Sequence, residues 1–235
     1  MSKENFVIGI LGGMGTYATI NLFRQYACVF PAKKEWERPR IIIDNRCTMP
    51  SRVRAFLYHE NVETLVNEMT DSLDNLSKSG CNKILLACNT SHIFLPQIYK
   101  KLPDLESKVV NIVYNCVDEI QNDYIEKVFL LGSEGTIDSC IYQEELEKRK
   151  INCLVPNKDE YCKLRECIEA VKQNNYSESI KKTFIELVNR YDNVILGCTE
   201  LPILYDKYKE NINVKKIYDP VMLGLKKIKE DYDNE

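Results

Sequence analysis

Residues 83–92 read KILLACNTSH, and residues 193–200 read NVILGCTE. Each stretch is a short apolar run that reaches a cysteine and continues with polar residues. Short, continuous apolar runs are typical of strands that are buried on both faces of a parallel sheet. We therefore expect Cys88 and Cys198 to lie at the carboxyl ends of two buried strands, where open α/β sheets gather their ligands.

Similar apolar runs predict further strands at residues 6–11, 40–44, 109–113, 127–131, 151–155 and 214–218. Between the runs, apolar residues at helical spacing predict helices over residues 61–78, 138–149 and 176–190. This alternation of strands and helices indicates parallel sheets built from strand–helix–strand units.

The chain also repeats its own pattern. A glycine-rich turn follows a strand at residues 12–15 and again at residues 132–135, and Cys198 comes 110 residues after Cys88. Matching motifs at similar separations favour an internal duplication. We predict an α/β fold with two similar Rossmann-like parallel-sheet domains, related by a pseudo-twofold axis, with a cleft between them if the halves face each other. The expected N-terminal domain comprises residues 1–113 plus a returning segment, 210–235, and the C-terminal domain comprises residues 114–209.

Composition excludes several classes of protein. The 235 residues are 44% hydrophobic and 29% charged, with a net charge of -3, so no basic excess favours a nucleic-acid partner. The apolar runs are too short to cross a membrane. No signal peptide is evident at the start of the sequence, and we expect a cytoplasmic protein.

The ten cysteines make up about 4% of the chain, below the share that is typical of a disulfide scaffold. There are only two histidines and no Cys-x-x-Cys pair, so the ligand clusters of a metal site are missing. Most of the cysteines are therefore expected to be small, buried apolar residues.

The first glycine-rich turn continues as GMGTYA at residues 13–18, between a strand and a helix. Its backbone N–H groups at a helix N-terminus suit a small anion such as a substrate carboxylate. A dinucleotide is an alternative, with Asp44 ending the next strand, although the spacing is longer than is typical. An ordinary strand–helix turn without a ligand is the third interpretation.

Two cysteines in matching positions of facing halves suit racemisation. That reaction removes a proton from one face of a carbon and returns a proton to the other, so it needs two acid–base groups on opposite sides. Two thiols supply these groups without a cofactor. Arg52, which follows a turn after the second strand, is a candidate for binding a carboxylate. The alternative for Arg52 is a solvated surface arginine. Lys172 and His92 are weighed in the same way: Lys172 is either a site residue or an exposed helix lysine, and His92 is either a partner of the turn around Thr90 or an ordinary polar core group.

The sequence resembles a known family through three motifs in order: Gly-Gly-Met-Gly at residues 12–15, CNTSH at 88–92 and GCTEL at 197–201. They are similar to those of the aspartate/glutamate racemase family, and most similar to the cofactor-independent aspartate racemases. The resemblance implies two α/β domains with the active site between them, no cofactor and no metal, and a homodimer. Glu200, where glutamate racemases have a histidine, favours the aspartate branch.

By the same resemblance, Cys88 and Cys198 are the catalytic residues. It assigns substrate binding to Met14, Arg52, Asn89, Thr90, Ser133, Thr136, Lys172, Thr199 and Glu200. The sequence departs from the family pattern near these positions, with Thr16 in place of proline, Ser91 in place of alanine and Ser51 in place of aspartate.

The expected function is racemisation of an acidic amino acid, aspartate first, by a two-cysteine mechanism. The alternatives within the superfamily are a glutamate-preferring or broad-specificity racemase and a dicarboxylate isomerase. A dinucleotide-dependent oxidoreductase and a two-lobed dicarboxylate-binding protein with a dead site are alternatives from other classes.

Overall fold

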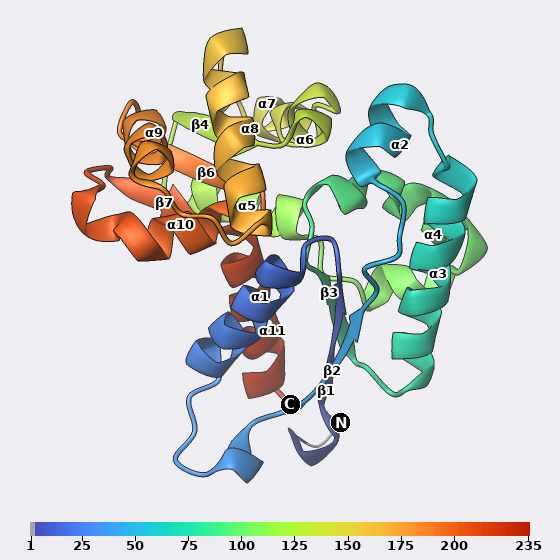
Figure 1. Ribbon diagram of the computed structural model, residues 1–235. Helices are drawn as coiled ribbons and strands as arrows, with labels where there is room; N and C mark the ends of the chain where they lie inside the picture. The colour runs from blue at the N-terminus through green and yellow to red at the C-terminus, as the bar shows by residue number, and fades with distance from the viewer. Residues whose placement is uncertain (1–2) are drawn as a thin grey trace.

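The computed structural model describes residues 3–235 and contains two parallel sheets (Figure 1). The first has the order β2-β1-β3 and the second the order β5-β4-β6-β7, and all the paired strands run parallel. The strands are β1 (Val7–Gly12), β2 (Arg40–Asn45), β3 (Lys83–Leu86), β4 (Lys127–Gly132), β5 (Asn152–Leu154), β6 (Asn193–Gly197) and β7 (Lys216–Tyr218). The prediction of an α/β fold with parallel sheets is confirmed.

The helices connect and cover these strands. They are α1 (Thr16–Val29), α2 (Arg52–Tyr58), α3 (Val62–Lys78), α4 (Leu95–Lys101), α5 (Ile112–Asn122), α6 (Glu134–Asp138), α7 (Gln143–Lys148), α8 (Lys158–Lys172), α9 (Glu178–Val188), α10 (Leu201–Tyr208) and α11 (Pro220–Asp233). A 3₁₀ turn, η3 (Thr90–Phe94), follows β3. No helix within residues 3–235 is long and apolar enough to cross a membrane.

The two halves share one strand order. β1 is central and is flanked by the next two strands of its half, and β4 is central and is flanked in the same way by β5 and β6. β3 and β6 are therefore equivalent strands, and Cys88 and Cys198 follow them. The difference between the sheets is β7, which adds to the outer edge of the second sheet by pairing with β6.

Both sheets are covered on both faces. In β1, Val7 and Leu11 pack in one core with α3, whereas Ile8 and Ile10 pack in another core with α1 and α11. This separation follows from the alternation of side chains along a strand. The second sheet is covered in the same way, by α8, α9 and α10 on one face and by α5 and α7 on the other. Burial on both faces explains why the strands read as continuous apolar runs.

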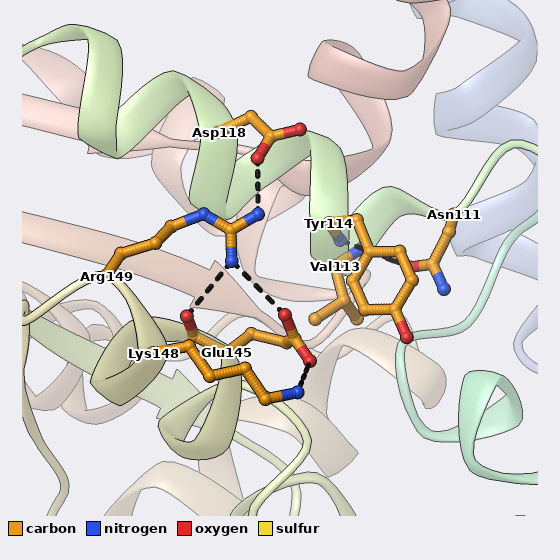
Figure 2. Close-up of polar contacts among 7 residues, drawn as sticks. All are labelled: Asn111, Val113, Tyr114, Asp118, Glu145, Lys148 and Arg149. Carbon is orange, nitrogen blue, oxygen red and sulfur yellow. Dashed lines mark hydrogen bonds and ion pairs between the residues drawn. The ribbon is translucent and has the colours of Figure 1, made fainter.

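The strand predicted at residues 109–113 is wrong. Only Val109 forms a bridge, with Ile84, and α5 begins at Ile112. The Asn111 side chain accepts hydrogen bonds from the N–H groups of Val113 and Tyr114, which caps the helix (Figure 2). A cap of this kind satisfies N–H groups that have no partner inside the helix, so it starts a helix within an apolar run.

The second half of α5 is linked to α7 by charged side chains. Arg149 donates to Asp118 on α5 at 2.6 Å and to Glu145 on α7 at 3.2 Å, and Lys148 also contacts Glu145 (Figure 2). The helix predicted over residues 138–149 is divided, because Cys140 adopts a left-handed conformation (φ 56°) between α6 and α7. The helices predicted over 61–78 and 176–190 are confirmed as α3 and α9.

The C-terminal segment contacts both halves. β7 belongs to the second sheet, whereas α11 runs beside α1 and also packs against α5 and β3 (Figure 1). The division into residues 1–113 plus 210–235 and residues 114–209 stays a prediction.

The cysteines are all free thiols, but the expectation that most are buried is wrong for half of them. Those that are buried are Cys81, Cys88, Cys116, Cys167 and Cys198, Cys153 is half-buried, and Cys28, Cys47, Cys140 and Cys162 are exposed. The composition does not separate the two groups, because each exposed cysteine lies on an outer helix face or in a turn where a small residue is tolerated.

Candidate active site

Cys88 and Cys198 line one cavity of about 70 Å³. Cys88 comes two residues after β3 ends, and Cys198 directly follows β6. The exposed fractions of the two residues are 8% and 9%, so both are almost fully buried. The two equivalent strand ends therefore bring their thiols to the walls of a shared space.

Most of the predicted site residues line this cavity. They are Met14, Arg52, Asn89, Thr90, Ser133, Lys172, Thr199 and Glu200, besides the two cysteines. Thr136 is the exception, because it is fully buried behind Thr90 and Ser133. Val53, Ile168 and Gly197 also line the cavity, although no role was predicted for them. Ile168 lies one helical turn before Lys172, a spacing that places both on one face of α8.

The Cys198 thiol has a charged partner. Its Sγ atom donates a hydrogen bond to Oε2 of Glu200 at 3.0 Å. Burial raises the pKa of Cys198 well above its ordinary value, and the adjacent Glu200 carboxylate raises it further. The Lys172 ammonium acts in the opposite direction without cancelling these effects. Cys198 is therefore a protonated thiol at neutral pH.

Glu200 is itself a buried carboxylate, with an exposed fraction of 2%. Oε2 also accepts from the Thr199 hydroxyl at 3.4 Å, whereas Oε1 has no hydrogen-bond partner. Oε1 lies beside Gly15, where a Cβ atom would come within 2.7 Å of it. Gly15 is the N-cap of α1, and the positive end of a helix dipole stabilises a negative charge there. The glycine-rich turn was predicted to bind a small anion, and the Glu200 carboxylate of the chain itself occupies a place beside it.

The turn itself is held by its own backbone. Gly13 has a φ of 84°, and a Cβ atom there would meet the Arg46 backbone at 2.4 Å, so only glycine fits. The Gly13 N–H donates to the Thr19 hydroxyl at 3.0 Å. The turn thereby positions Met14, whose carbonyl accepts a hydrogen bond from Arg52.

Arg52 begins α2, which Ser51 caps by accepting from the N–H of Arg54. The Arg52 guanidinium donates to the carbonyls of Met14 at 2.6 Å and Pro50 at 3.1 Å. Its Nε atom is buried and has no partner. Two backbone carbonyls thus fix the orientation of the Arg52 guanidinium group, and its Nε–H group has no partner within the described part of the chain.

The residue after Cys88 is positioned from the other half of the chain. The Tyr142 hydroxyl donates to Oδ1 of Asn89 at 2.5 Å, and both side chains are buried. Because Oδ1 is the acceptor, Nδ2 of Asn89 is a donor, and it has no partner. Tyr142 was missed in the sequence, since nothing local connects residues 53 positions apart.

A cluster of three hydroxyls joins the two halves beside the cavity. Thr90 Oγ1 lies 2.9 Å from both Ser133 and Thr136, which are 3.0 Å from each other. Gly135 permits this approach, because a Cβ atom there would meet Thr90 at 2.9 Å. The cluster holds η3 against α6 and places two hydroxyls, those of Thr90 and Ser133, at the cavity wall.

His92 braces the Cys88 loop and does not line the cavity. Its Nε2 atom accepts from the N–H of Ile112, so Nδ1 carries the proton and donates to the carbonyls of Cys88 and Asn89. Burial lowers the pKa of His92 to about 4, so the ring is neutral at physiological pH. The interpretation of His92 as a polar core group agrees with this geometry.

Lys172 ends α8 and remains partly exposed, with an ion pair to Glu169 at 2.8 Å. Burial acts to lower the pKa of Lys172, but the contact with Glu169 and the negative charge of Glu200 outweigh it, so the pKa is raised. Lys172 is therefore a cation at the second half's side of the cavity.

The unpartnered polar atoms of the cavity describe a complementary ligand. Two are donors, Arg52 Nε and Asn89 Nδ2, and one is an acceptor, Glu200 Oε1. Buried polar groups are nearly always hydrogen-bonded, so such atoms on three residues that line one cavity indicate a missing partner. A molecule with a carboxylate for the donors and an ammonium group for the acceptor satisfies all three. No metal-binding group of three or more His, Cys, Asp or Glu side chains occurs within the described residues 3–235.

The cavity volume limits the size of the ligand. A water molecule takes up about 30 Å³ in the liquid, so about 70 Å³ corresponds to only a few water molecules. A small amino acid matches this space, whereas a dinucleotide is far larger. The cavity therefore does not support the dinucleotide interpretation of the glycine-rich turn.

Comparison with known proteins gives a consistent result. The sequence model of the Asp/Glu/Hydantoin racemase family matches residues 11–228. The broad specificity amino-acid racemase RacX of Bacillus subtilis is 27% identical over 217 residues, which cover 88% of this chain and 91% of that protein. A Bacillus cereus glutamate racemase is 30% identical over 68% of this chain and 56% of its own length. The structure of Picrophilus torridus aspartate racemase has a TM-score of 0.80 and 26% identity, and the match covers 97% of this chain and 98% of that one.

Proposed function

We propose that this chain, which belongs to the Asp/Glu/Hydantoin racemase family, interconverts the L and D enantiomers of aspartate without a cofactor. The observation that carries the proposal is that two cysteines at equivalent strand ends line one small cavity. The similarity to Picrophilus torridus aspartate racemase over nearly the whole chain supports aspartate as the first candidate.

In the proposed mechanism, one cysteine acts as a thiolate and takes the α-proton of the bound amino acid. The opposite cysteine, as a thiol, gives its proton to the other face of the same carbon. The first sulfur ends as a thiol and the second as a thiolate, so the charge of the pair is conserved. The roles of Cys88 and Cys198 exchange when the reaction runs in reverse.

The polar groups of the cavity account for substrate binding. Oε1 of Glu200 accepts from the α-ammonium group, and the donors Arg52 Nε and Asn89 Nδ2 bind carboxylate oxygens. The carbanion gains enolate character on the α-carboxylate, and preorganised donors that face it lower the barrier by roughly 3–4 kcal/mol each. The Thr90 and Thr199 hydroxyls are further candidates for this contact, Met14, Ser133 and Thr136 complete the binding site, and Lys172 is the candidate for a distal carboxylate.

A second candidate is a glutamate-preferring or broad-specificity racemase. The curated relatives include both kinds, and Lys172 favours some tolerance of chain length. Its ammonium group is at the end of a flexible side chain, is partly exposed and is held by the surface residue Glu169. A distal carboxylate one methylene further away can be met by a shift of this side chain.

The deciding experiment incubates the protein with L-aspartate, L-glutamate or maleate in heavy water, with no cofactor added. We expect α-deuteration by NMR and formation of D-aspartate by chiral chromatography. Faster turnover of glutamate would establish the second candidate, and turnover of maleate alone would establish a dicarboxylate isomerase. Saturable aspartate binding without α-deuteration would overturn the proposal in favour of a binding protein. The homodimer and the cytoplasmic location stay predictions.

A further inference from the structure

The two thiols of the cavity have different partners. Cys198 donates to a buried carboxylate oxygen of Glu200 at 3.0 Å. Within residues 3–235, the Cys88 thiol makes no hydrogen bond to a charged side chain. The two residues are almost equally exposed, at 8% and 9%, and the hydrogen bonds in the described part of the chain differ in that Cys198 alone has a carboxylate partner. The sheets are alike at this point, so the asymmetry arises from the residues that follow each cysteine.

The other charged and titratable groups around Cys198 do not remove this asymmetry. Lys172 on α8 faces it with a positive charge, but that ammonium group also pairs with Glu169. Tyr161, also on α8, lies near Cys198, and burial raises the pKa of its phenol, so it stays protonated and neutral. On the other side, the donors with no partner, Arg52 Nε and Asn89 Nδ2, belong to the same half as Cys88.

We propose that Glu200 keeps Cys198 protonated in the substrate-free protein, so that Cys88 begins the turnover as the base and Cys198 as the acid. Glu200 acts here through Cys198, as a positioning residue for its proton. This inference rests on the proposed racemase function.

The proton balance of this cycle is simple. The Cys88 thiolate takes the α-proton and becomes a thiol, and the Cys198 thiol gives its proton to the opposite face and becomes a thiolate. Glu200 stays a carboxylate throughout. Cys198 then recovers a proton and Cys88 loses one by exchange with water, which restores the resting form. The resting form is therefore ready for the enantiomer whose α-hydrogen faces Cys88.

The test measures which thiol reacts first with iodoacetamide, since the thiolate is the reactive form. The folded full chain is alkylated near neutral pH, and peptide mass spectrometry follows each cysteine separately. We expect Cys88 to react at least about tenfold faster than Cys198, because the Glu200 carboxylate at 3.0 Å disfavours the Cys198 thiolate. Glu200→Gln removes the charge with little change of shape and should speed alkylation of Cys198 about tenfold, leaving Cys88 within about twofold.

Glu166→Gln is the matched control, because it removes a glutamate from an exposed position of α8 and should change neither rate. Equal rates for the two cysteines in the unmodified protein would overturn the inference, as would an unchanged Cys198 rate in folded Glu200→Gln. If that variant does not fold, the rates in the unmodified protein still decide. Alkylation needs no substrate, so failure of the racemase proposal is seen separately, as absence of α-deuteration.

Discussion

The ends of β3 and β6 occupy the same place in two equivalent sheets, yet they differ in what surrounds the cysteine. The loop after β3 is braced from within, because His92 bonds the carbonyls of Cys88 and Asn89. The loop after β6 instead places a carboxylate against its own thiol, at 3.0 Å. Shared topology thus supplies two thiols on one cavity, whereas the local sequence decides how each thiol holds its proton.

The largest effect is expected where the two ends are alike. Cys88→Ser and Cys198→Ser should each lower kcat/KM for both enantiomers by about 10²–10⁴-fold, the usual contribution of a general acid or base. Steady-state racemisation measured by polarimetry checks this. Cys162→Ser, at an exposed position of α8, is the control and should be fully active. Near-normal turnover of either site variant would leave one thiol without a role and break the equivalence of the two strand ends.

The next effect concerns two buried groups that titrate in opposite directions, His92 at the Cys88 end and Asp219 after β7. Burial lowers the pKa of His92 to about 4, so its share of stability is lost as pH falls from 6.5 toward 4. Burial raises the pKa of Asp219 to about 6, so its share is lost as pH rises from 3.8 through 6. In the native protein the two effects oppose each other.

Replacing either His92 or Asp219 should reveal the pH dependence of stability that the other residue causes. Relative to the native protein, Asp219→Asn should lose about 2 kcal/mol of unfolding free energy between pH 7 and pH 4, and His92→Gln should gain about 3 kcal/mol over the same range. Asparagine remains a good helix cap, so α11 is retained. Urea unfolding at several pH values gives the measurement. Parallel pH curves for the variants and the native protein would show that neither group titrates as described.

Substitutions of Arg52 test the Cys88 side of the cavity, where none of the described acidic side chains pairs with the thiol. Arg52→Ala should raise KM and lower kcat/KM by roughly 10–150-fold, because a hydrogen bond to a charged group is worth about 1.5–3 kcal/mol. Arg52→Lys keeps the charge but loses the Nε donor and should recover only part of the loss. Arg54→Ala is the control, since Arg54 is exposed and pairs with Glu60 on the surface. Equal kinetics for both variants at position 52 and the native protein would remove Arg52 from the site.

The smallest effect belongs to the contact that links the halves. Tyr142→Phe removes the donor to Oδ1 of Asn89 and leaves a buried oxygen without a partner, at a cost of about 1 kcal/mol in unfolding free energy. A modest, severalfold rise in KM is expected with it, because Asn89 Nδ2 is no longer held. Tyr124→Phe, at a position that is 92% exposed, should change neither quantity. Thermal unfolding and steady-state kinetics of the two variants make the comparison.

The strand ends were predictable because each is written in one continuous stretch of sequence. KILLACNT and NVILGCTE predict the two strands and the positions of Cys88 and Cys198, and the family resemblance of the same stretches added the roles of Asn89 and Glu200. The glycine-rich turn was predictable for the same reason. The strand predicted at 109–113 failed because a helix cap at Asn111 outweighs an apolar run, and only the hydrogen bonds to Asn111 reveal it.

Contacts between distant segments were not predictable. The donation from Tyr142 to Asn89 and the hydroxyl cluster of Thr90, Ser133 and Thr136 join different halves, and no spacing rule relates their positions. The Cys198–Glu200 hydrogen bond lies within three residues, but whether the side chain turns back to the thiol depends on the space that Gly15 leaves beside it. The sequence therefore predicted which residues belong to the site, but it did not predict which of them form hydrogen bonds with one another.

The small cavity between the cysteines also has a consequence for inhibitor discovery. Its volume of about 70 Å³ admits few non-hydrogen atoms, and the most efficient small ligands gain about 1.5 kcal/mol from each. Nanomolar affinity needs about 12 kcal/mol, so roughly eight atoms would have to bind at this ceiling. Drug-sized compounds are therefore poor starting points. Charged fragments of amino-acid size, or fragments that carry an electrophile for Cys88, suit this site better.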